Sequence, residues 1–444
     1  MNHPLAWGLR SRASLSTMDT PRARKNVTNE AQTVVKQHFN VRGHFILIAI
    51  VSLLALSGCR FSSRPSPQAK QGVLDLRNWD FQKDGLAQLH GQWYVSWRKL
   101  LTPKDFQGKR HHHKTFFSIP SFWNNAQIAK DKKMGSFGYA TFFLRVHLPT
   151  QARSLPQGLG LLSPNQRTAN RLWILDESGH PLTAPLHNGN VGTTKSTHIP
   201  QLKPEQTQFR PKQHKTLWLV LQVSNFQHTN AGPYKAPSLG DARQLIAYQR
   251  YHRQLTFFLL GMIAFMAFYH LLLFSYRTAD KAPLWFSGFC GTMILRIELT
   301  SNHLYGVFSS QGMWDFLLRL EHITVFIACS FAGLFVQSIF SQEIRKKWAL
   351  YFAWFGVAFT VTTLLTPIPL YTRLVFFYQP FLLLFILYII VKLTRTYFRS
   401  RDSIALWLLG GFFVGSITVF HDLLHHRNWI TSAYLSQYGL LVFI

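Results

Sequence analysis

Hydrophobic and polar positions divide the chain into two unlike parts. From residue 254 to residue 444, apolar runs alternate with short and mostly basic interruptions. A helix needs roughly 20 apolar residues to cross the ~30 Å hydrocarbon core of a bilayer. A further run begins near Ser432 and reaches Ile444 incomplete, so we expect seven membrane-spanning helices with the seventh span incomplete in this chain. The six complete runs are 255–276, 283–300, 317–340, 348–366, 374–391 and 404–421.

Basic residues lie in alternate turns between these runs. The turns on one side hold most of them, whereas the turns on the other side hold Arg373 and Arg427. Cytoplasmic turns of membrane proteins are enriched in Lys and Arg, so the first run is expected to start outside the cytoplasm. The residues of the basic side are Arg277, Lys281, Arg345, Lys346, Lys347, Lys392, Arg395, Arg399 and Arg401.

The N-terminal region predicts export. Residues 45–56 (FILIAIVSLLAL) are too short to span a bilayer comfortably and are typical of the apolar core of a signal peptide. Leu56-Ser57-Gly58-Cys59 resembles the bacterial lipobox, in which the cysteine is lipidated. We therefore predict a lipoprotein-type signal sequence over 1–58, lipidation of Cys59, and a flexible tether over 59–71. An uncleaved signal anchor is the alternative, and both interpretations place residues 60–250 outside the cytoplasm.

Residues 72–240 lack helical periodicity and consist of short apolar runs separated by Gly, Pro, Asn and Asp. This pattern predicts an all-β sandwich. Residues 241–254 (DARQLIAYQRYHRQ) predict a linker helix that leads into the membrane region 255–444. The expected strands are 91–97, 139–147, 158–162, 171–175 and 217–223.

Several short segments carry a resemblance to a known family. They are 72–81 (GVLDLRNWDF), 89–97 (LHGQWYVSW), 120–124 (PSFWN), 138–141 (GYAT), 171–174 (RLWI) and 222–226 (QVSNF). In this order they resemble the extracytoplasmic domain of bacterial seven-transmembrane receptors with diverse intracellular signalling modules. The resemblance continues to about residue 340 and more weakly beyond. It implies a galactose-binding-like jelly roll followed by a seven-helix bundle, and in the family a cytoplasmic cyclase, kinase or phosphatase follows the last span.

Charge narrows the choice of partners. The chain has 47 Lys and Arg against 18 Asp and Glu, a formal net charge of +29. Such a surface favours acidic ligands or anionic lipid headgroups, or it is only a basic solvated surface. The membrane context makes nucleic acid the least favoured partner. Three cysteines, none of them between 60 and 250, exclude a disulfide framework for the β domain.

A binding module is favoured over an enzyme for residues 72–240. Glycoside hydrolysis needs paired carboxylates, and the acidic residues here are few and lie mostly in apparent turns. We therefore predict no enzymatic activity for this chain, no cofactor and no metal site. Carbohydrate sites need aromatic platforms and a few polar groups, although tryptophans of a sandwich are more often core residues. The candidate ligand-binding residues are Trp79, Trp123, Tyr139, Arg167, Arg171, Asn225, His228 and Tyr234.

Two histidine-rich segments contain residue types that can ligate a metal. His111, His112 and His113 have no nearby Cys, Asp or Glu to complete a site, so a solvated loop is favoured. His421, Asp422 and His425 share a helical face, but polar residues that close a helix at the membrane surface are the favoured interpretation.

Four ionisable residues fall within or beside membrane runs, where charge is costly. Arg296 and Glu298 lie in the second run, and Arg319 and Glu321 lie near the start of the third. If the two helices are antiparallel neighbours, Arg296 pairs with Glu321 and Glu298 with Arg319. The pairs are interpreted either as a structural brace or as a latch with two states.

We therefore predict a multi-pass protein of the bacterial inner membrane that acts as a signal-transduction receptor. A periplasmic jelly roll senses a carbohydrate or small acidic molecule, and the helices relay the signal to a cytoplasmic signalling protein or output module that is expected to lie outside this chain. The alternatives are a membrane transport or channel protein and an anchored carbohydrate-binding surface protein.

Overall fold

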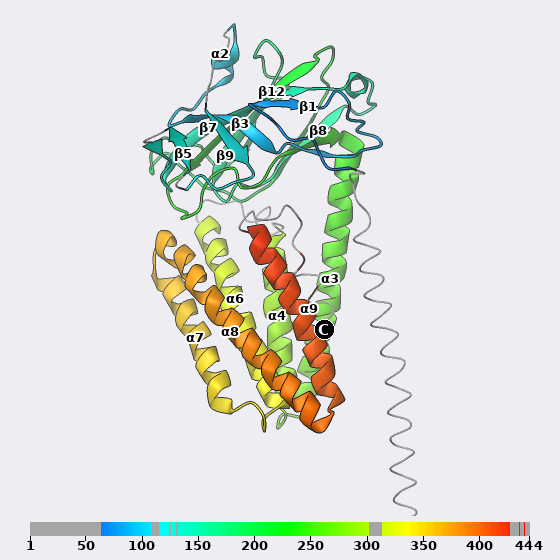
Figure 1. Ribbon diagram of the computed structural model, residues 1–444, viewed down its shortest axis with the longest axis vertical. Coiled ribbons are helices and arrows are strands. Elements are labelled where there is room, and N and C mark those ends of the chain that lie inside the picture. The colour runs from blue at the N-terminus through cyan, green and yellow to red at the C-terminus, as the bar shows by residue number, and fades with distance from the viewer. Residues whose placement is uncertain are drawn as a thin grey trace, which may run out of the picture. The chain divides into compact units, whose positions relative to one another are not determined.

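Figure 1 shows the computed structural model, which describes residues 64–108, 115–124, 126–129, 132–301 and 313–426 together with residues 435 and 439. The first described part is rich in β-strands and ends at Asp241, where the first long helix begins. The predictions for the signal sequence, for Cys59, for His111, His112 and His113, and for nearly all of the seventh run fall outside the described residues.

The larger sheet has seven strands. Six of them follow the order β10-β9-β12-β7-β3-β4, and β1 pairs with β7 in parallel. Strand β12 lies between β7 and β9, and all of its residues take part in antiparallel pairs. The strands are β1 (Val73–Asp75), β3 (Gly91–Trp97), β4 (Phe116–Ile119), β7 (Gly138–His147), β9 (Ala169–Leu175), β10 (Leu186–Asn188) and β12 (Thr216–Asn225).

The smaller sheet has four strands in the order β11-β8-β13-β2. Its strands are β2 (Ala87–Gln88), β8 (Leu159–Ser163), β11 (Glu205–Phe209) and β13 (Ser238–Asp241). A separate two-stranded pair joins β5 (Gln127–Ala129) to β6 (Lys132–Lys133), and two short helices, α2 (Pro103–Phe106) and η1 (Thr150–Arg153), lie in the connections.

The hydrophobic core lies between the two sheets. Alternate residues of β7, among them Phe142 and Leu144, join Leu161 of β8 and Leu239 of β13 in one buried cluster. The intervening residue Phe143 is also buried, but on the outer face, where it packs against Phe106 and Trp173. Burial on both faces explains why β7 reads as a nearly continuous apolar run. The five expected strands are confirmed as β3, β7, β8, β9 and β12, whereas the jelly-roll connectivity stays a prediction.

The predicted tether is wrong for residues 64–70. Arg64 forms an ion pair of 2.9 Å with Asp84, and the Ser66 hydroxyl accepts a hydrogen bond of 2.8 Å from the Gln88 amide. Ala69 pairs with the backbone of β3 on both sides, through His90 and Gln92. The Pro- and Ser-rich composition suggested a flexible segment, but specific polar partners in the folded domain hold it.

Each of the six complete apolar runs is confirmed as a helix. Helix α3 is continuous over 35 residues, so the predicted linker helix and first span are one helix of about 52 Å. Among the described residues, all of these helices except α4 are long and apolar enough to cross a membrane. Helix α4 carries Arg296 and Glu298, which lower its hydropathy. The helices are α3 (Ala242–Tyr276), α4 (Ala282–Thr300), α6 (Met313–Ile339), α7 (Lys346–Leu365), α8 (Ile368–Ser400) and α9 (Ser403–His426).

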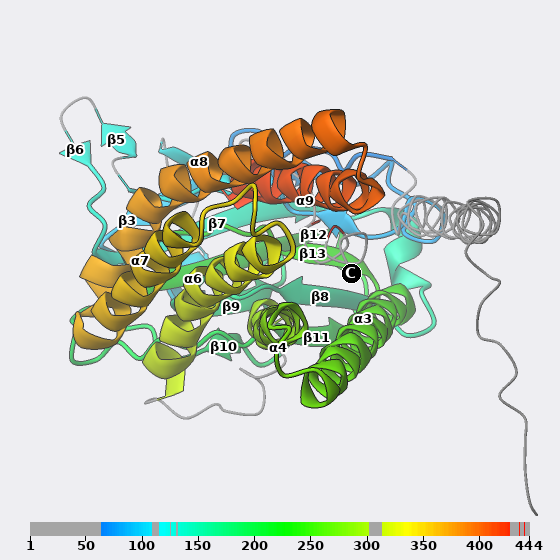
Figure 2. The same ribbon diagram turned by 90° about the horizontal axis from the view of Figure 1, so that it is seen from below.

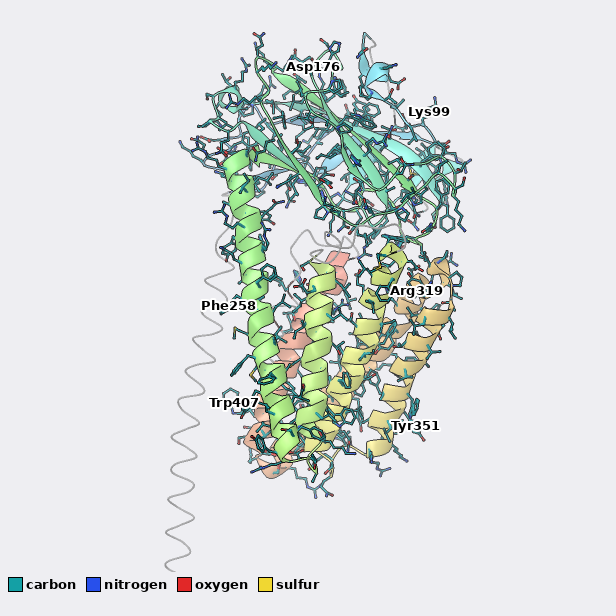
Figure 3. The ribbon with its side chains drawn as sticks, turned by 180° about the vertical axis from the view of Figure 1, so that it is seen from behind. Lys99, Asp176, Phe258, Arg319, Tyr351 and Trp407 are labelled. Carbon is teal, nitrogen blue, oxygen red and sulfur yellow. The ribbon has the colours of Figure 1, made fainter. Side chains whose placement is uncertain are left out.

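The helices pack mainly on their neighbours in sequence. Figure 2 looks along them and shows α3, α4, α6 and α7 in succession, with α8 beside α6 and α7 and α9 beside α8. Large apolar side chains also cover the outer surface of the bundle. Phe258 on α3 is 63% exposed and Tyr351 on α7 is 62% exposed (Figure 3). In water such a surface is unfavourable, whereas in a bilayer it is solvated by lipid, as expected of a membrane domain.

Asp241 joins the β-rich part to the first helix, and this role predicts the effect of its replacement. Its carboxylate accepts a hydrogen bond of 2.7 Å from the Arg243 amide and caps α3. We expect Asp241→Ala to lower stability by about 1 kcal/mol, seen as a lower midpoint of thermal unfolding of the full chain. Asp241→Asn keeps a capping oxygen and is expected to stay near the wild type. Equal losses in both variants would contradict the capping role.

Candidate functional site

Asn225 organises the loop that follows the central strand β12. Its side-chain amide donates to the carbonyl of Ser136 at 2.8 Å and to that of His228 at 2.7 Å. Its side-chain oxygen accepts from the His228 amide at 3.0 Å. Asn225 is fully buried, so these hydrogen bonds replace water and fix the course of residues 226–230.

His228 lies inside this loop and is 3% exposed. Its Nδ1 lies 2.7 Å from the Asn230 carbonyl oxygen and 3.0 Å from the Asn230 amide nitrogen. Burial, followed by the positive charge of Arg167, lowers the pKa of His228 to about 3. The imidazole is therefore neutral at physiological pH and acts as a packed polar group of the loop.

The aromatic ring of Tyr234 lies next to the same loop. Its ring stacks on Phe122 with the ring centroids 5.5 Å apart, and its hydroxyl donates to the side-chain oxygen of Asn165 at 2.9 Å. The Arg167 guanidinium lies 5.1 Å and the Lys235 ammonium 5.4 Å from the centre of this ring. Two cations thus gather on one aromatic side chain, an arrangement suited to an anionic or acceptor-rich ligand.

Trp123 and Asn124 close the site from a second segment. Trp123 has no exposed surface and packs in the sandwich core, so it is a core residue and not a platform for a ligand. The Asn124 side chain donates to the carbonyl of Thr229 and accepts from the Ala231 amide at 3.1 Å. The segment 122–124 therefore fixes the far side of the loop 226–234.

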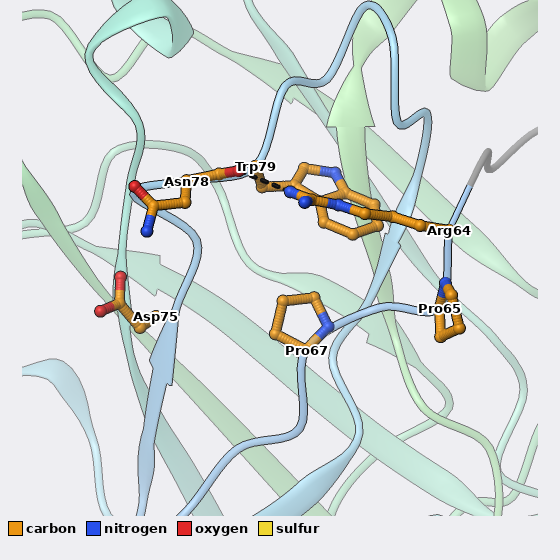
Figure 4. A pocket seen from close by; sticks show the side chains of 6 residues that line it. All are labelled: Arg64, Pro65, Pro67, Asp75, Asn78 and Trp79. Carbon is orange, nitrogen blue, oxygen red and sulfur yellow. Dashed lines mark hydrogen bonds between the residues drawn. The ribbon is translucent and has the colours of Figure 1, made fainter.

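The other candidate ligand residues lie elsewhere. Trp79 is 1% exposed, and its indole donates to the carbonyl of Gly85 at 3.0 Å. It lines a pocket of about 330 Å³ with Pro65, Pro67 and Asp75, but the Arg64 guanidinium covers its ring at 4.8 Å (Figure 4). A ligand there must displace Arg64 before it can stack on Trp79.

Tyr139 and Arg171 project from the face of the larger sheet that points away from the core between the sheets. Each alternates along its strand with core-facing residues, Ala140 in β7 and Leu172 in β9. The Arg171 guanidinium lies 5.6 Å from the centre of the Trp173 ring. The structure therefore gathers Arg167, Asn225, His228 and Tyr234 but leaves Trp79, Tyr139 and Arg171 apart from them.

The loop 226–234 touches the helical region. The Thr229 hydroxyl donates to the carbonyl of Pro369 at 3.1 Å and lies 2.7 Å from the Thr372 hydroxyl at the start of α8. A second contact comes from Leu202, which is 4% exposed and packs in one cluster with Trp314 and Leu317 of α6. We name these two contacts, Thr229 with Thr372 and Leu202 with α6, the junction.

A polar network continues from the junction into the helices. The Tyr371 hydroxyl donates to one carboxylate oxygen of Asp315 at 2.9 Å, and the other oxygen accepts from Arg319 at 3.0 Å. The Arg319 guanidinium also lies 4.7 Å from the centre of the Tyr371 ring. It donates further to the carbonyls of Thr363, Leu364 and Thr366 at the end of α7. Arg319, labelled in Figure 3, thus connects α6, α7 and α8.

The predicted ion pairs of the membrane region are wrong in their partners. Arg319 pairs with Asp315 on its own helix rather than with Glu298, because a residue four positions away lies on the same helix face. Arg296 does reach Glu321, but it donates to the backbone carbonyl at 3.2 Å rather than to the carboxylate. The predicted proximity of the two helices is confirmed, since α4 and α6 are in contact.

His421 lies 3.2 Å from the carboxylate of Asp422, and the same carboxylate accepts from the Leu435 amide at 2.7 Å. These contacts fit the polar closure of α9. Within the part of the chain that the structure describes, no three His, Cys, Asp or Glu side chains gather as metal ligands.

The fold and the site define a multi-helix membrane domain joined to a β-rich domain. Residues 252–444, somewhat less than half of the chain, match the family model described as 7TM diverse intracellular signalling. No curated protein gives a match.

Solved structures of bacterial glycosidases share similarity with part of the chain. β-Glucuronidase of Faecalibacterium prausnitzii is 13% identical with a TM-score of 0.25, over 35% of this chain and 31% of the enzyme. β-Glucuronidase of Ruminococcus gnavus, in complex with D-glucaro-d-lactam, is 12% identical with a TM-score of 0.24, over 35% of this chain and 28% of the enzyme. The chain thus spans less than a third of the length of either enzyme, and at these scores the similarity assigns no activity.

Sequence reasoning missed the residues that form the junction. Thr229, Thr372 and Tyr371 are ordinary polar residues next to strand or helix ends, and no spacing relates positions more than 140 residues apart. The pairing of Asp315 could have been predicted, because Asp315 stands four positions before Arg319 in a helix and such spacing favours an ion pair.

The network around Asp315 predicts different effects for two tyrosines of α8. Tyr371→Phe removes a hydrogen bond to a carboxylate, and we expect it to destabilise the full chain by about 2 kcal/mol. The buried Tyr378 hydroxyl interacts only weakly with the Cys329 thiol and has no carboxylate partner, so Tyr378→Phe is the matched control, with a much smaller expected loss. Unfolding midpoints in detergent measure both variants. Equal midpoints for the two would show that the bond to Asp315 contributes no stability.

Proposed function

We propose that this protein is a signal-transduction receptor in which the β domain binds a ligand outside the cytoplasm and the helices pass the change to a cytoplasmic signalling module. The junction is the observation that carries the proposal. It joins the loop next to the candidate ligand residues to the first turns of α6 and α8. A domain that served only as an anchored binding surface needs no such contact.

The chemistry of the site supports a carbohydrate or small acidic ligand. Arg167 and Lys235 lie over the ring of Tyr234, and cations over an aromatic ring favour carboxylates or hydroxyl-rich molecules. Hydroxyl groups of a sugar would add hydrogen bonds to these two cations, whereas the Tyr234 ring is 7% exposed and packs on Phe122. We therefore assign the ligand site to the surface around Tyr234, at the base of the loop 226–234.

The orientation supports the same proposal. The basic turns between helices, at Arg277, at Lys346 and at Arg401, all fall on one side of the bundle in the predicted topology. The β domain precedes α3 and therefore lies on the opposite side, which we assign to the periplasm of a bacterial inner-membrane protein.

Two engineered cysteines test this orientation. We expect Lys195→Cys in the β domain to react with a membrane-impermeant maleimide in spheroplasts, because Lys195 is exposed. Lys347→Cys at the start of α7 is also exposed and is expected to react only after lysis. The wild-type chain, with Cys59, the buried Cys290 and the half-buried Cys329, serves as the background. Labelling of Lys347→Cys in unbroken spheroplasts would contradict the orientation.

The junction predicts a selective loss of coupling. We expect D-glucuronate or D-galactose to slow hydrogen exchange at 226–234 and also in the first turns of α6 and α8 of the full chain in nanodiscs. In Thr372→Val the effect on the loop is expected to remain, while the effect on the helices falls at least several-fold because the hydroxyl contact with Thr229 is lost.

Thr396→Val is the matched control for this measurement. Thr396 lies in the same helix and makes the same hydrogen bond to its own backbone, to Lys392, as Thr372 makes to Ile368. Protection that stays within the β domain of the wild type would identify an anchored binding protein instead of a receptor. Protection by neither sugar at millimolar concentration would count against this class of ligand.

A further inference from the structure

A buried histidine holds a second loop of the β domain against the end of β12. Residues 189–201 follow β10 and lead to Leu202 of the junction. The backbone of this loop closes on itself through Asn190 and Ile199, which exchange hydrogen bonds of 2.8 and 3.0 Å. His198 is 2% exposed and lies against the end of β12, where its Nδ1 is 2.8 Å from the Ser224 hydroxyl.

The surrounding hydrogen bonds fix the proton positions of this histidine. The Thr168 hydroxyl donates its proton to the Ser224 carbonyl, so toward the His198 Nε2, 3.5 Å away, it can only accept. Nε2 therefore carries the proton of the neutral ring. The Ser224 hydroxyl accepts from the Gly192 amide at 3.2 Å and donates its own proton to Nδ1.

A proton added to Nδ1 breaks this arrangement. Nδ1 would then become a donor that faces the donating hydroxyl of Ser224. The hydroxyl proton must rotate away from Nδ1, so that Oγ accepts from the charged ring while its own proton loses its acceptor. Because the site is buried, neither the displaced hydroxyl proton nor the charged ring finds water as a substitute.

The neighbours of the imidazole give the charge no compensation. The ring contacts Ser224 at the end of β12, Phe226 just after it and Thr168 before β9, and none of these titrates near neutral pH. Lys195, the charged residue of the loop, is exposed. Burial alone lowers the pKa of His198 to about 4.

We propose that His198 is a proton-sensing site: protonation releases the loop 189–201 and with it the contact of Leu202 on α6. This inference rests on the proposed function, because it names the proton as one signal that the same junction transmits. The loop continues directly into Leu202, which packs against Trp314 and Leu317. Release of the loop thus frees one of the two contacts that make up the junction.

The linkage between protonation of His198 and closure of the loop gives the direction and size of the pH effect. The pKa is low in the closed loop and near 6.5 once the ring is in water. The closed state is therefore fully favoured above pH 6.5 and loses stability as the pH falls, until the loss is complete near pH 4. With these two pKa values, the ratio of open to closed loop rises roughly 30-fold between pH 8 and pH 5.

Hydrogen exchange of the full chain in nanodiscs tests the inference. We expect the amides of residues 190–199 to lose about 30-fold in protection from pH 8 to pH 5, after correction for the intrinsic exchange rate at each pH. The amides of β7 and β12, which lie in the same sheet, serve as the internal standard and are expected to stay protected. A smaller loss of protection is expected at the start of α6.

Two variants separate the titration of His198 from general effects of acid on the protein. His198→Gln keeps one acceptor and one donor without a titrating group, so its loop is expected to stay closed at both pH values. Ser224→Ala removes the partner of Nδ1 and is expected to open the loop even at pH 8. His187→Gln, which replaces an exposed histidine one residue before the end of β10, is the matched control and keeps the wild-type response.

The outcomes distinguish the two proposals. A wild-type loop whose protection does not change with pH, or a pH response that persists in His198→Gln, overturns the proton-sensing role. Opening of the loop 189–201 without any change at α6 supports proton sensing by His198 but contradicts transmission through the junction. Opening that is accompanied by a change at α6 supports both.

Discussion

The register of β12 is the constraint on which the rest of the β domain depends. It pairs with β7 along its whole length and with β9 from Trp218 to Ser224, and its alternation points successive side chains to opposite faces. At its end, Ser224 faces outward to His198, and Asn225 faces inward to His228. A shift of one residue would exchange these two side chains and detach both loops. The loops that reach the helices are therefore positioned by two consecutive residues of one strand.

A few polar side chains likewise connect the ends of the helices. Asp315 lies in the first turn of α6 and Arg319 reaches the last carbonyls of α7, so each charge lies where the helix dipole favours it. Their ion pair keeps two charges near the membrane surface from being isolated, and Tyr371 adds the link to α8. Because Thr372 is the next residue of that helix, the contact with Thr229 adjoins this network directly.

Much of the fold could be predicted from the sequence, because its elements are buried in characteristic ways. The runs of β7 and β12 are apolar on both faces, and the membrane helices meet a length set by the bilayer. Pairings across long separations could not be predicted. Arg64 and Asp84, or His198 and Ser224, meet only because the sheets bring them together. Trp79 and Trp123 had the chemistry of a sugar platform, yet their size made them core residues.

The candidate site shows the same limit. Arg167, Asn225, His228 and Tyr234 were predicted from their chemistry and do gather, because they lie in neighbouring loops at one end of the sandwich. Their roles differ from one another for reasons of burial. Asn225 and His228 are internal supports of a loop, whereas Arg167 and Lys235 sit on the face of Tyr234. Asn225 and His228 are buried, whereas Arg167 and Lys235 keep part of their surface, and only the folded chain shows this difference.

The size of the junction sets how strong a signal it can carry. A ligand shifts a two-state equilibrium only by its difference in affinity for the two states, and the difference must pass through contacts that change. One hydroxyl contact contributes about 1 kcal/mol, and burial of one leucine contributes about 2 kcal/mol. Together they allow a coupling of about 3 kcal/mol, or roughly a hundredfold change in population. Two small contacts are thus sufficient for a switch, and a weak junction also remains reversible.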